Sequence, residues 1–252
     1  MKKILYIIGV LLALASCTEE DAAVQPQEVT TQTFSVAISE PDYAPQTRAT
    51  VTMSRYLLEI YEGSLSATPV RQENSSGTFS VVMKKGVDYI CLFWADEGAD
   101  AYDASNLQAV EQATATHPGT TAYCARVTVN SNNFDGNITL RRAVAELSFI
   151  DKNGLTGADN TLTVTYPYAS AVMNLGTGKV TYNTGSSVVH TLTGITSPTS
   201  SAEAFASDFI LAPAEERSLR ELKLQLNNEE EKTIPEVVVQ ANYKTKITGE
   251  YK

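Results

Sequence analysis

The chain has 252 residues, of which 19% are charged and 43% are hydrophobic, and its formal net charge is -10. Nucleic acids and anionic lipid surfaces bind basic faces, so this acidity argues against both, and we expect no nucleic-acid partner. The 12 tyrosines, together with many valines and threonines, favour pleated strands over helices, and the length allows one large or two smaller domains.

The chain begins with Met1-Lys2-Lys3 and an apolar run from Ile4 to Ala15, which match the charged and apolar regions of a secretory signal. The run is too short to span a bilayer. It ends in Leu14-Ala15-Ser16-Cys17, which resembles the lipobox of bacterial lipoproteins, where a peptidase cuts before the cysteine and the cysteine is acylated. We predict residues 1–16 as a lipoprotein signal peptide and Cys17 as a membrane attachment; an ordinary secretory signal is the alternative.

Residues 17–32 carry acidic and amide side chains without apolar periodicity, which predicts a flexible acidic tether. Thr18-Glu19-Glu20-Asp21 follows the cysteine and resembles the surface-export signal of Bacteroidota lipoproteins, although an acidic protein often has an acidic tether in any case. We expect a lipid-anchored protein at the outer membrane, on the cell surface.

The first strand is predicted from Thr33 to Ser39, where apolar residues alternate with small or polar ones. Residues 79–83 and 89–95 flank Lys84-Lys85-Gly86 and predict a hairpin. A three-residue spacing that begins at Leu107 indicates one short helix. The other strands predicted before the turn-rich residues 131–137 are 51–61 and 123–130.

Arg48 stands alone among small residues in a linker where two prolines disfavour regular structure. An exposed linker arginine is accessible to a trypsin-like protease, so the bond between Arg48 and Ala49 is a candidate processing site. The alternative is a linker arginine that is never cut.

After the turn-rich connector, residues 138–150 form a strand whose alternation is interrupted at Arg141-Arg142. The interruption indicates a bulge or a change of sheet, and we interpret the two arginines as a solvated edge. Short strands separated by turns predict an all-β fold of two tandem β-sandwich domains, residues 33–136 and 137–252. The later strands are predicted at 161–166, 178–182, 188–193, 208–211, 219–226, 233–240 and 243–251.

Cys91 and Cys124 are the cysteines that remain once Cys17 is assigned to lipidation. Cys91 lies in a strand that is apolar on both faces, whereas Cys124 alternates with polar residues opposite an apolar face. The two thiols are therefore expected in different environments. Two free thiols are the default prediction, and a disulfide is the open alternative.

Catalytic motifs are missing from the sequence. His117 and His190 have no cysteine or histidine partner at metal-ligand spacing, and no nucleophile elbow or phosphate-binding loop occurs, so we expect neither an enzyme nor a cofactor. Asp96, Asp100 and Asp103, with Glu97, carry oxygen ligands that could suit calcium. They lack the spacing of an EF-hand, so we interpret them as a solvated acidic loop and predict no metal site.

Several stretches, in this order and spacing, resemble the fimbrillin family of Bacteroidales, which provides subunits and accessory proteins of the protease-assembled type V pili. The resemblance covers nearly the whole mature chain. Besides the lipobox, the stretches that carry it are Gln46–Thr50, Cys91–Asp96, Leu140–Leu147, Asn174–Gly178, Phe209–Pro213 and Asn242–Gly249.

The resemblance implies a lipoprotein precursor with two transthyretin-like Greek-key sandwiches. An arginine-specific protease would cut after Arg48 and remove the first strand, and another subunit's strand would fill the groove that this exposes. The implied donor is residues 237–251, with Val237, Val239, Tyr243 and Ile247 on it. Alternatively, this terminal segment closes its own sandwich. The family also includes anchors and tip proteins that keep their N-terminus.

The expected function is therefore a structural or adhesive subunit of a cell-surface pilus, with other pilus subunits as partners through strand exchange. The alternative is a surface lipoprotein that binds a glycan or host protein without polymerising. Aromatic side chains can stack on sugars, but Trp94 lies in the most apolar strand, where core packing is its expected role.

Overall fold

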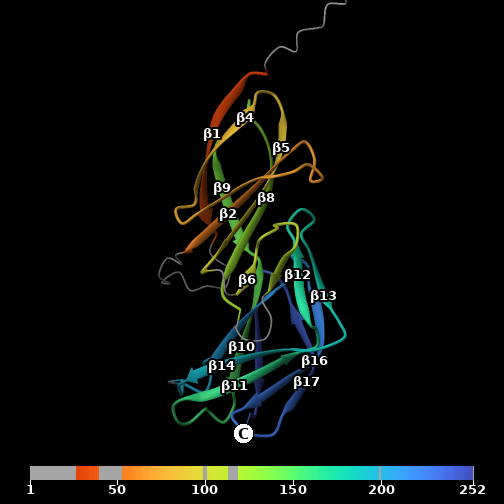
Figure 1. The fold of residues 1–252 in the computed structure, drawn as a ribbon. Helices are drawn as coiled ribbons and strands as arrows, with labels where there is room; N and C mark the ends of the chain where they lie inside the picture. The colour runs from red at the N-terminus through yellow and green to blue at the C-terminus, as the bar shows by residue number, and fades with distance from the viewer. Residues whose placement is uncertain (1–26, 40–52, 99–100, 113–118, 199, 252) are drawn as a thin grey trace, which may run out of the picture.

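The computed structural model describes residues 27–39, 53–98, 101–112, 119–198 and 200–251. The expected all-β fold is confirmed, because every regular element in these ranges is a strand. None of the described ranges contains a helix that is long and apolar enough to cross a membrane. The molecule is elongated, with the N-terminal strands at one end and the C-terminal strands at the other (Figure 1).

The N-terminal strands form one seven-stranded sheet in the order β3-β2-β5-β8-β9-β1-β4 (Figure 1). Its edge strands β3 and β4 come close to each other, and side-chain amides bridge them: Gln72 Nε2 donates to the carbonyl of Ser80 and Asn74 Nδ2 to that of Thr78, both at 2.9 Å. The strands are β1 (Val29–Ile38), β2 (Arg55–Glu62), β3 (Val70–Asn74), β4 (Thr78–Lys84), β5 (Asp88–Asp96), β8 (Ala122–Asn130) and β9 (Asn137–Arg142).

The predicted hairpin around Lys84-Lys85-Gly86 is wrong. The turn is present, but β4 pairs with β1, whereas β5 lies between β2 and β8. Residues 91–96 of β5 are all buried, so this strand needs a hydrogen-bonded neighbour on each edge and side chains packed on both faces. The alternation of apolar residues in β4 and β5 identified the strands but not their partners.

The predicted short helix is also wrong, because residues 102–112 contain β6 (Tyr102–Asp103) and β7 (Val110–Gln112). β7 pairs with β12 (Ser170–Asn174), which in turn pairs with β13 (Lys179–Asn183). A segment of the N-terminal half thus extends a sheet of the C-terminal half. Leu107 and Val110 are fully buried in that junction, and their spacing reflects tertiary packing rather than a helical face.

The change of sheet predicted at Arg141-Arg142 is confirmed. β9 ends at Arg142 in the N-terminal sheet, and after Ala143 the chain enters β10 in a different sheet. Residues 137–142 therefore pair with the N-terminal strands although we predicted that the second domain begins at 137. The division into two tandem transthyretin-like domains stays a prediction.

The C-terminal strands form a three-stranded sheet, β15-β10-β18, and a four-stranded sheet, β14-β11-β16-β17. β10 is buried along its whole length and pairs with β15 and β18. Bounds are β10 (Val144–Asp151), β11 (Asn160–Tyr166), β14 (Val188–Ile195), β15 (Ala206–Leu211), β16 (Arg217–Leu226), β17 (Lys232–Val239) and β18 (Lys244–Gly249).

Two hydrophobic cores hold the molecule together. One lies within the curled N-terminal sheet and includes Phe34, Phe79 and Phe93. The other begins on the outer face of β2 and β5, with Leu57 and Trp94, and continues through β7 into both C-terminal sheets. Trp94 is completely buried in it, as expected. Because the second core crosses from one half to the other, burial of apolar area stabilises the junction between them.

Glu221 in β16 has a left-handed backbone, with φ of 61°, and is exposed. It lies opposite Pro235, which has no N–H to donate, and the β16–β17 ladder skips this position. Replacing Glu221 with glycine should raise the free energy of unfolding by about 0.5–1 kcal/mol, because glycine adopts positive φ without strain. Urea unfolding measures the change. The control Glu236→Gly, on the exposed face of β17, should instead lower stability, and an equal loss in both variants would contradict the argument.

Candidate functional site

β1, the strand that precedes Arg48, lies between two neighbours of opposite direction. It pairs antiparallel with β4 from Val29 to Ser35 and parallel with β9 from Ser35 to Ile38. The strand begins at Val29 rather than at the predicted Thr33, because residues 29–32 pair with β4; the predicted tether therefore extends four residues too far. β1 is thus paired along both of its edges.

The apolar side chains of β1 pack on the N-terminal core, with Val36 and Ile38 half-buried against it. Phe34 is the one fully buried residue of the strand, and its ring lies 5.4 Å from that of Phe93 and 4.5 Å from that of Phe134. Removal of β1 would expose this part of the N-terminal core and the facing edges of β4 and β9. An apolar trough between two unpaired strand edges is the geometry that accepts an added strand.

The predicted donor residues lie within two different sheets of their own chain. Val237 and Val239 are buried in β17, which pairs with β16, and Ile247 is buried in β18, which pairs with β10. Tyr243 precedes β18 and is 52% exposed. The terminal segment therefore closes its own fold here, and donation of it to another subunit stays a prediction.

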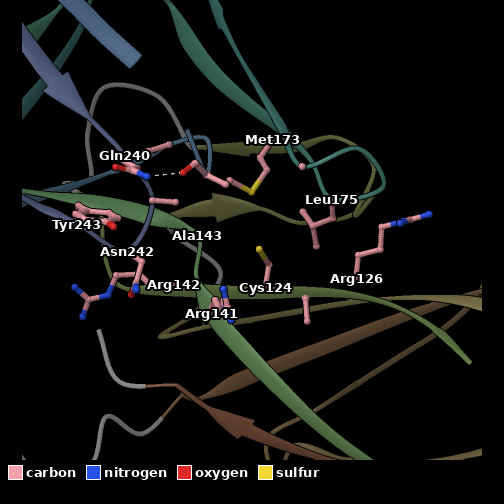
Figure 2. A pocket seen from close by; sticks show the side chains of 15 residues that line it. Cys124, Arg126, Arg141, Arg142, Ala143, Met173, Leu175, Gln240, Asn242 and Tyr243 are labelled. Atoms are coloured by element: carbon pink, nitrogen blue, oxygen red, sulfur yellow. Dashed lines mark hydrogen bonds between the residues drawn. The ribbon is translucent and has the colours of Figure 1, made fainter. Parts of the chain in front are cut away.

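A cavity of about 420 Å³ lies where β8 and β9 meet the C-terminal half (Figure 2). Met173, Leu175 and Cys124 converge in it, whereas the guanidinium of Arg126 extends away (Figure 2). On another side Gln240 Nε2 donates to the carbonyl of Ala214 at 2.7 Å. The walls offer apolar contacts and guanidinium groups, with no carboxylate or histidine among the lining residues.

Arg142, at the edge of this cavity, is buried, so the interpretation of Arg141-Arg142 as a solvated edge holds only for the exposed Arg141. The Arg142 guanidinium stacks over Phe209 at 5.6 Å from the ring centroid and lies 3.5 Å from Glu146. Glu146 Oε1 also forms an ion pair with Lys244 Nζ, at 2.7 Å. A buried charge needs such partners, and the group therefore ties β9, β10 and the start of β18 together.

Two of the candidate calcium ligands, Asp96 and Asp103, are engaged in other contacts. Asp96 is fully buried and accepts Arg55 Nε at 2.9 Å and Trp94 Nε1 at 2.7 Å. The charge and hydrogen bond of Asp96 raise the pKa of Arg55 although burial opposes this. Asp103 accepts the N–H of Ser105, which lowers the pKa of that carboxyl. Asp100 lies outside the described residues. Within the described ranges, no three metal-ligating side chains are grouped closely enough to hold an ion.

Cys91 and Cys124 are both free thiols, and the expectation of different environments is confirmed. Cys91 lies in the core inside the N-terminal sheet, whereas Cys124 packs against the core that crosses the junction. Neighbouring strands carry them, but the two thiols point to opposite faces.

Burial raises the pKa of both thiols from 9.0 to about 12. The thiolate is the reactive form, so alkylation by iodoacetamide at mildly alkaline pH should be about a thousandfold slower in the folded than in the unfolded protein, as followed by mass. Equal rates would contradict this burial. Because the folded pKa is raised, these thiols stabilise the fold fully below pH 9.0, and this contribution is lost as pH rises toward about 12.

His190, for which the sequence suggested no partner, belongs to a sealed polar cluster. Its Nδ1 lies 2.6 Å from Asp208 Oδ2, which also accepts the Tyr166 hydroxyl at 2.7 Å. Burial, and then the charge of Asp208, raise the pKa of Tyr166 well above its ordinary value. His190 and Asp208 are at most 1% exposed, so solvent and substrates cannot reach them. This cluster supports the core; its members lie too far apart in sequence for a spacing motif. His117 lies outside the described residues.

The predicted lipidation and processing residues, Cys17, Arg48 and Ala49, also lie outside the described residues. They rest on the sequence alone.

Residues 24–251 match the model of a family of unknown function, DUF6562. The chain belongs to this family. No curated protein matches the DUF6562 chain in sequence. Among solved structures, it resembles a "putative cell adhesion protein" from Bacteroides ovatus with a TM-score of 0.56 and 15% identity, covering 89% of this chain and 94% of that one.

A second "putative cell adhesion protein", from Bacteroides uniformis, resembles the DUF6562 chain with a TM-score of 0.52 and 12% identity, covering 87% of this chain and 94% of the other. The fimbrial anchor protein Mfa2 of Porphyromonas gingivalis is more distant, with a TM-score of 0.43, 10% identity and 78% of each chain covered. At the identities of the two Bacteroides proteins, the likeness is one of fold.

Proposed function

We propose that this protein is a cell-surface structural or adhesive protein related to the fimbrillins. It is built as a lipoprotein precursor with two tandem transthyretin-like domains, and it joins other pilus subunits by strand exchange. The fold it shares with cell adhesion proteins of Bacteroides supports the proposal. Its role is structural rather than catalytic, with Cys17 as the lipid anchor on the outer membrane.

The position of β1 carries the proposal. The strand precedes Arg48, it has one fully buried residue, Phe34, and it separates β4 from β9. A cut between Arg48 and Ala49 leaves a fragment attached through this ladder, and its loss opens a trough lined by the N-terminal core. A strand that is held by hydrogen bonds, one buried aromatic ring and the half-buried Val36 and Ile38 can be exchanged for another strand of the same pattern.

Treatment of the purified precursor with an arginine-specific protease tests strand exchange. We expect a new N-terminus at Ala49, release of the fragment that contains β1, and oligomers in size-exclusion chromatography. The Arg48→Gln variant should stay uncut and monomeric. Cleavage at Arg48 that yields a stable monomer would reject polymerisation.

A second function, a surface lipoprotein that binds a glycan or host protein without polymerising, is favoured by the terminal segment. β18 is already paired with β10, and Ile247 and Tyr251 are buried, so donating this strand costs the chain its own packing. Filaments on intact cells would favour the pilus subunit. Binding on a glycan array that is lost when Tyr243 is changed to alanine would favour the binding module.

Gly136 allows β1 to approach β9, and a substitution there tests how β1 is held. A Cβ at this position would lie 2.7 Å from the carbonyl oxygen of Thr33, and φ is +80°. Gly136→Ala should lower stability by about 2–3 kcal/mol and speed hydrogen exchange in β1, through backbone strain and the clash. Gly63→Ala has similar φ strain, at +70°, but no atom within 4 Å, so it isolates the clash. Unchanged exchange in β1 would show that the contact does not hold the strand.

A further inference from the structure

The cavity of about 420 Å³ where β8 and β9 meet the C-terminal half, called the junction cavity below, is enclosed by five separate segments. They are β8, β9, β12 with the turn after it, and the loops that follow β15 and β17. β8 and β9 pair with each other at this point, through Tyr123–Arg142 and Cys124–Arg141. An occupant therefore meets side chains rather than a free strand edge between these two strands. A cavity of this volume between two parts of a molecule is typical of a small-molecule site.

One part of the junction cavity is apolar. Met173 and Leu175 are buried, Cys124 is half-buried, and the three side chains converge there (Figure 2). Small side chains complete much of the remaining lining and leave the space open: Ala125, Ala143, Gly178, Ala212, Ala214 and Ala241. An apolar chain or ring placed among them would remove this surface from water.

The rim of the junction cavity is cationic. Residues that face each other in an antiparallel pair project to the same side of the sheet, as do residues two apart on one strand, so Arg141 and Arg126 share the face of Cys124. Both arginines are exposed, and Arg126 extends outward from the cavity (Figure 2). Neither forms an ion pair within the described part of the chain. A bound carboxylate or sulfate would supply the missing countercharge through charge-assisted hydrogen bonds.

The lining selects against cations and neutral sugars. It contains no aspartate or glutamate, although the chain has a net charge of -10, so a cation would find no counterion in it. Its one aromatic residue is Tyr243, which is 52% exposed, so it offers little of the stacking surface that sugars use. An anion with an apolar body matches both the charge of the rim and the apolar interior.

Arg142, the third arginine of the lining, is already engaged within the protein. Its guanidinium lies 3.5 Å from Glu146 and stacks over Phe209. The two exposed arginines are therefore the ones that remain for a ligand, and they place its charged group at the rim rather than in the interior.

We propose that the junction cavity binds a small amphipathic anion. The apolar body of the ligand packs against Met173 and Leu175, and its carboxylate or sulfate lies at the rim with Arg126 and Arg141. The cavity is formed in the uncut chain, so this binding does not depend on processing at Arg48 or on exchange of β1.

Calorimetric titration of the full chain with three probes of equal chain length tests the charge preference. We expect decanoate to bind at least roughly tenfold more tightly than decanol or decyltrimethylammonium. Decanoate binding should also weaken as salt rises, because the rim is exposed to solvent. Equal binding of the three probes, or no binding of decanoate, would overturn the proposal.

Methionine methyl resonances and matched variants locate the binding. In protein labelled at the methionine methyls, decanoate should shift the resonance of Met173 and leave those of Met53 and Met83, in the N-terminal core, unchanged. The double change Arg126→Gln and Arg141→Gln should weaken decanoate at least roughly tenfold and leave decanol unchanged. Arg220→Gln, at an exposed position of β16, is the control.

Unchanged decanoate binding by the double variant, or a shift of Met53 or Met83 alone, would overturn the proposal. Two further probes separate the sources of an anionic group. Binding of phosphatidylglycerol–phosphatidylcholine vesicles without binding of free decanoate would assign the two arginines to a membrane surface. Tighter binding of hexaglutamate than of decanoate would assign them to an acidic protein segment. Either result would overturn the choice of a small amphipathic ligand.

Discussion

Replacing Gly119 with alanine should lower the free energy of unfolding by about 4 kcal/mol or prevent folding. A Cβ at this position would lie 1.6 Å from the carbonyl oxygen of Phe209 and 2.7 Å from Gln112 Nε2. The first of these atoms belongs to the backbone of β15 and cannot rotate away. The variant must therefore separate the segment before β8 from β15.

That separation breaks the contacts through which Gln112 joins the two halves. Gln112 Nε2 donates to the carbonyl of Phe209 at 2.8 Å, and its Oε1 accepts the N–H of Leu211 at 3.1 Å. The side-chain amide thus pairs with the edge of β15 as a neighbouring strand would. Buried amide and carbonyl groups that lose such partners cost about 1–3 kcal/mol each.

Urea unfolding compares Gly119→Ala with Gly249→Ala. The nearest atom to a Cβ at position 249 is 3.6 Å away, an ordinary contact, and neither glycine has a positive φ. The control should change stability by less than about 0.5 kcal/mol. A small effect of both substitutions would mean that β15 can move away from residue 119 at little cost.

The Asp208→Ala substitution should also lower the free energy of unfolding by about 4 kcal/mol, because it removes a buried carboxylate that accepts hydrogen bonds from several buried donors. Tyr166 and His190 would lose their acceptor, and Gly119 N, which donates to Asp208 Oδ1 at 3.0 Å, would be left unpaired. All these groups are buried, so water cannot replace the lost bonds without a rearrangement of the core.

The Asp208→Asn substitution separates lost hydrogen bonds from lost volume. Asparagine keeps one oxygen for Gly119 N and replaces the other oxygen with a donor that no longer accepts from Tyr166. We expect an intermediate loss, of about 2 kcal/mol, in the same urea experiment. Tyr166→Phe, which removes one donor, should lose less when combined with Asp208→Asn than when introduced alone. Strict additivity of the two changes would contradict a direct bond between them.

The amino-acid pattern predicted strands well where period-two alternation is set by residues close in sequence. β8 and β11 lie within one residue of the predicted bounds, and the change of sheet follows Arg142 as expected; β2 begins at Arg55, later than predicted. The pattern placed Trp94 in the core and the two thiols on different faces. The signal peptide, Cys17, Arg48 and Ala49 still rest on the sequence alone.

Contacts between residues far apart in sequence could not be predicted in this way. The backbone groups of a strand are the same whatever its side chains, so alternation identifies a strand and its inner face but not its neighbours. For this reason the sequence predicts that β4 pairs with β5, whereas β4 pairs with β1. It also predicts a helix at β7, because the sequence does not show that this segment pairs with β12. The sequence predicts a solvated Arg142 because it does not show that Glu146, on the next strand, is buried beside the guanidinium and pairs with it.

By itself, then, the sequence determined an all-β chain and the approximate positions of most of its strands, because side chains on a pleated strand point to alternate faces. Only the tertiary structure decided that Gln112 pairs with the edge of β15, that Asp208 accepts hydrogen bonds from several donors, and that β9 lies between β8 and β1. Each of these depends on which strands become neighbours, and that is settled by the simultaneous packing of both cores and the pairing of buried polar groups.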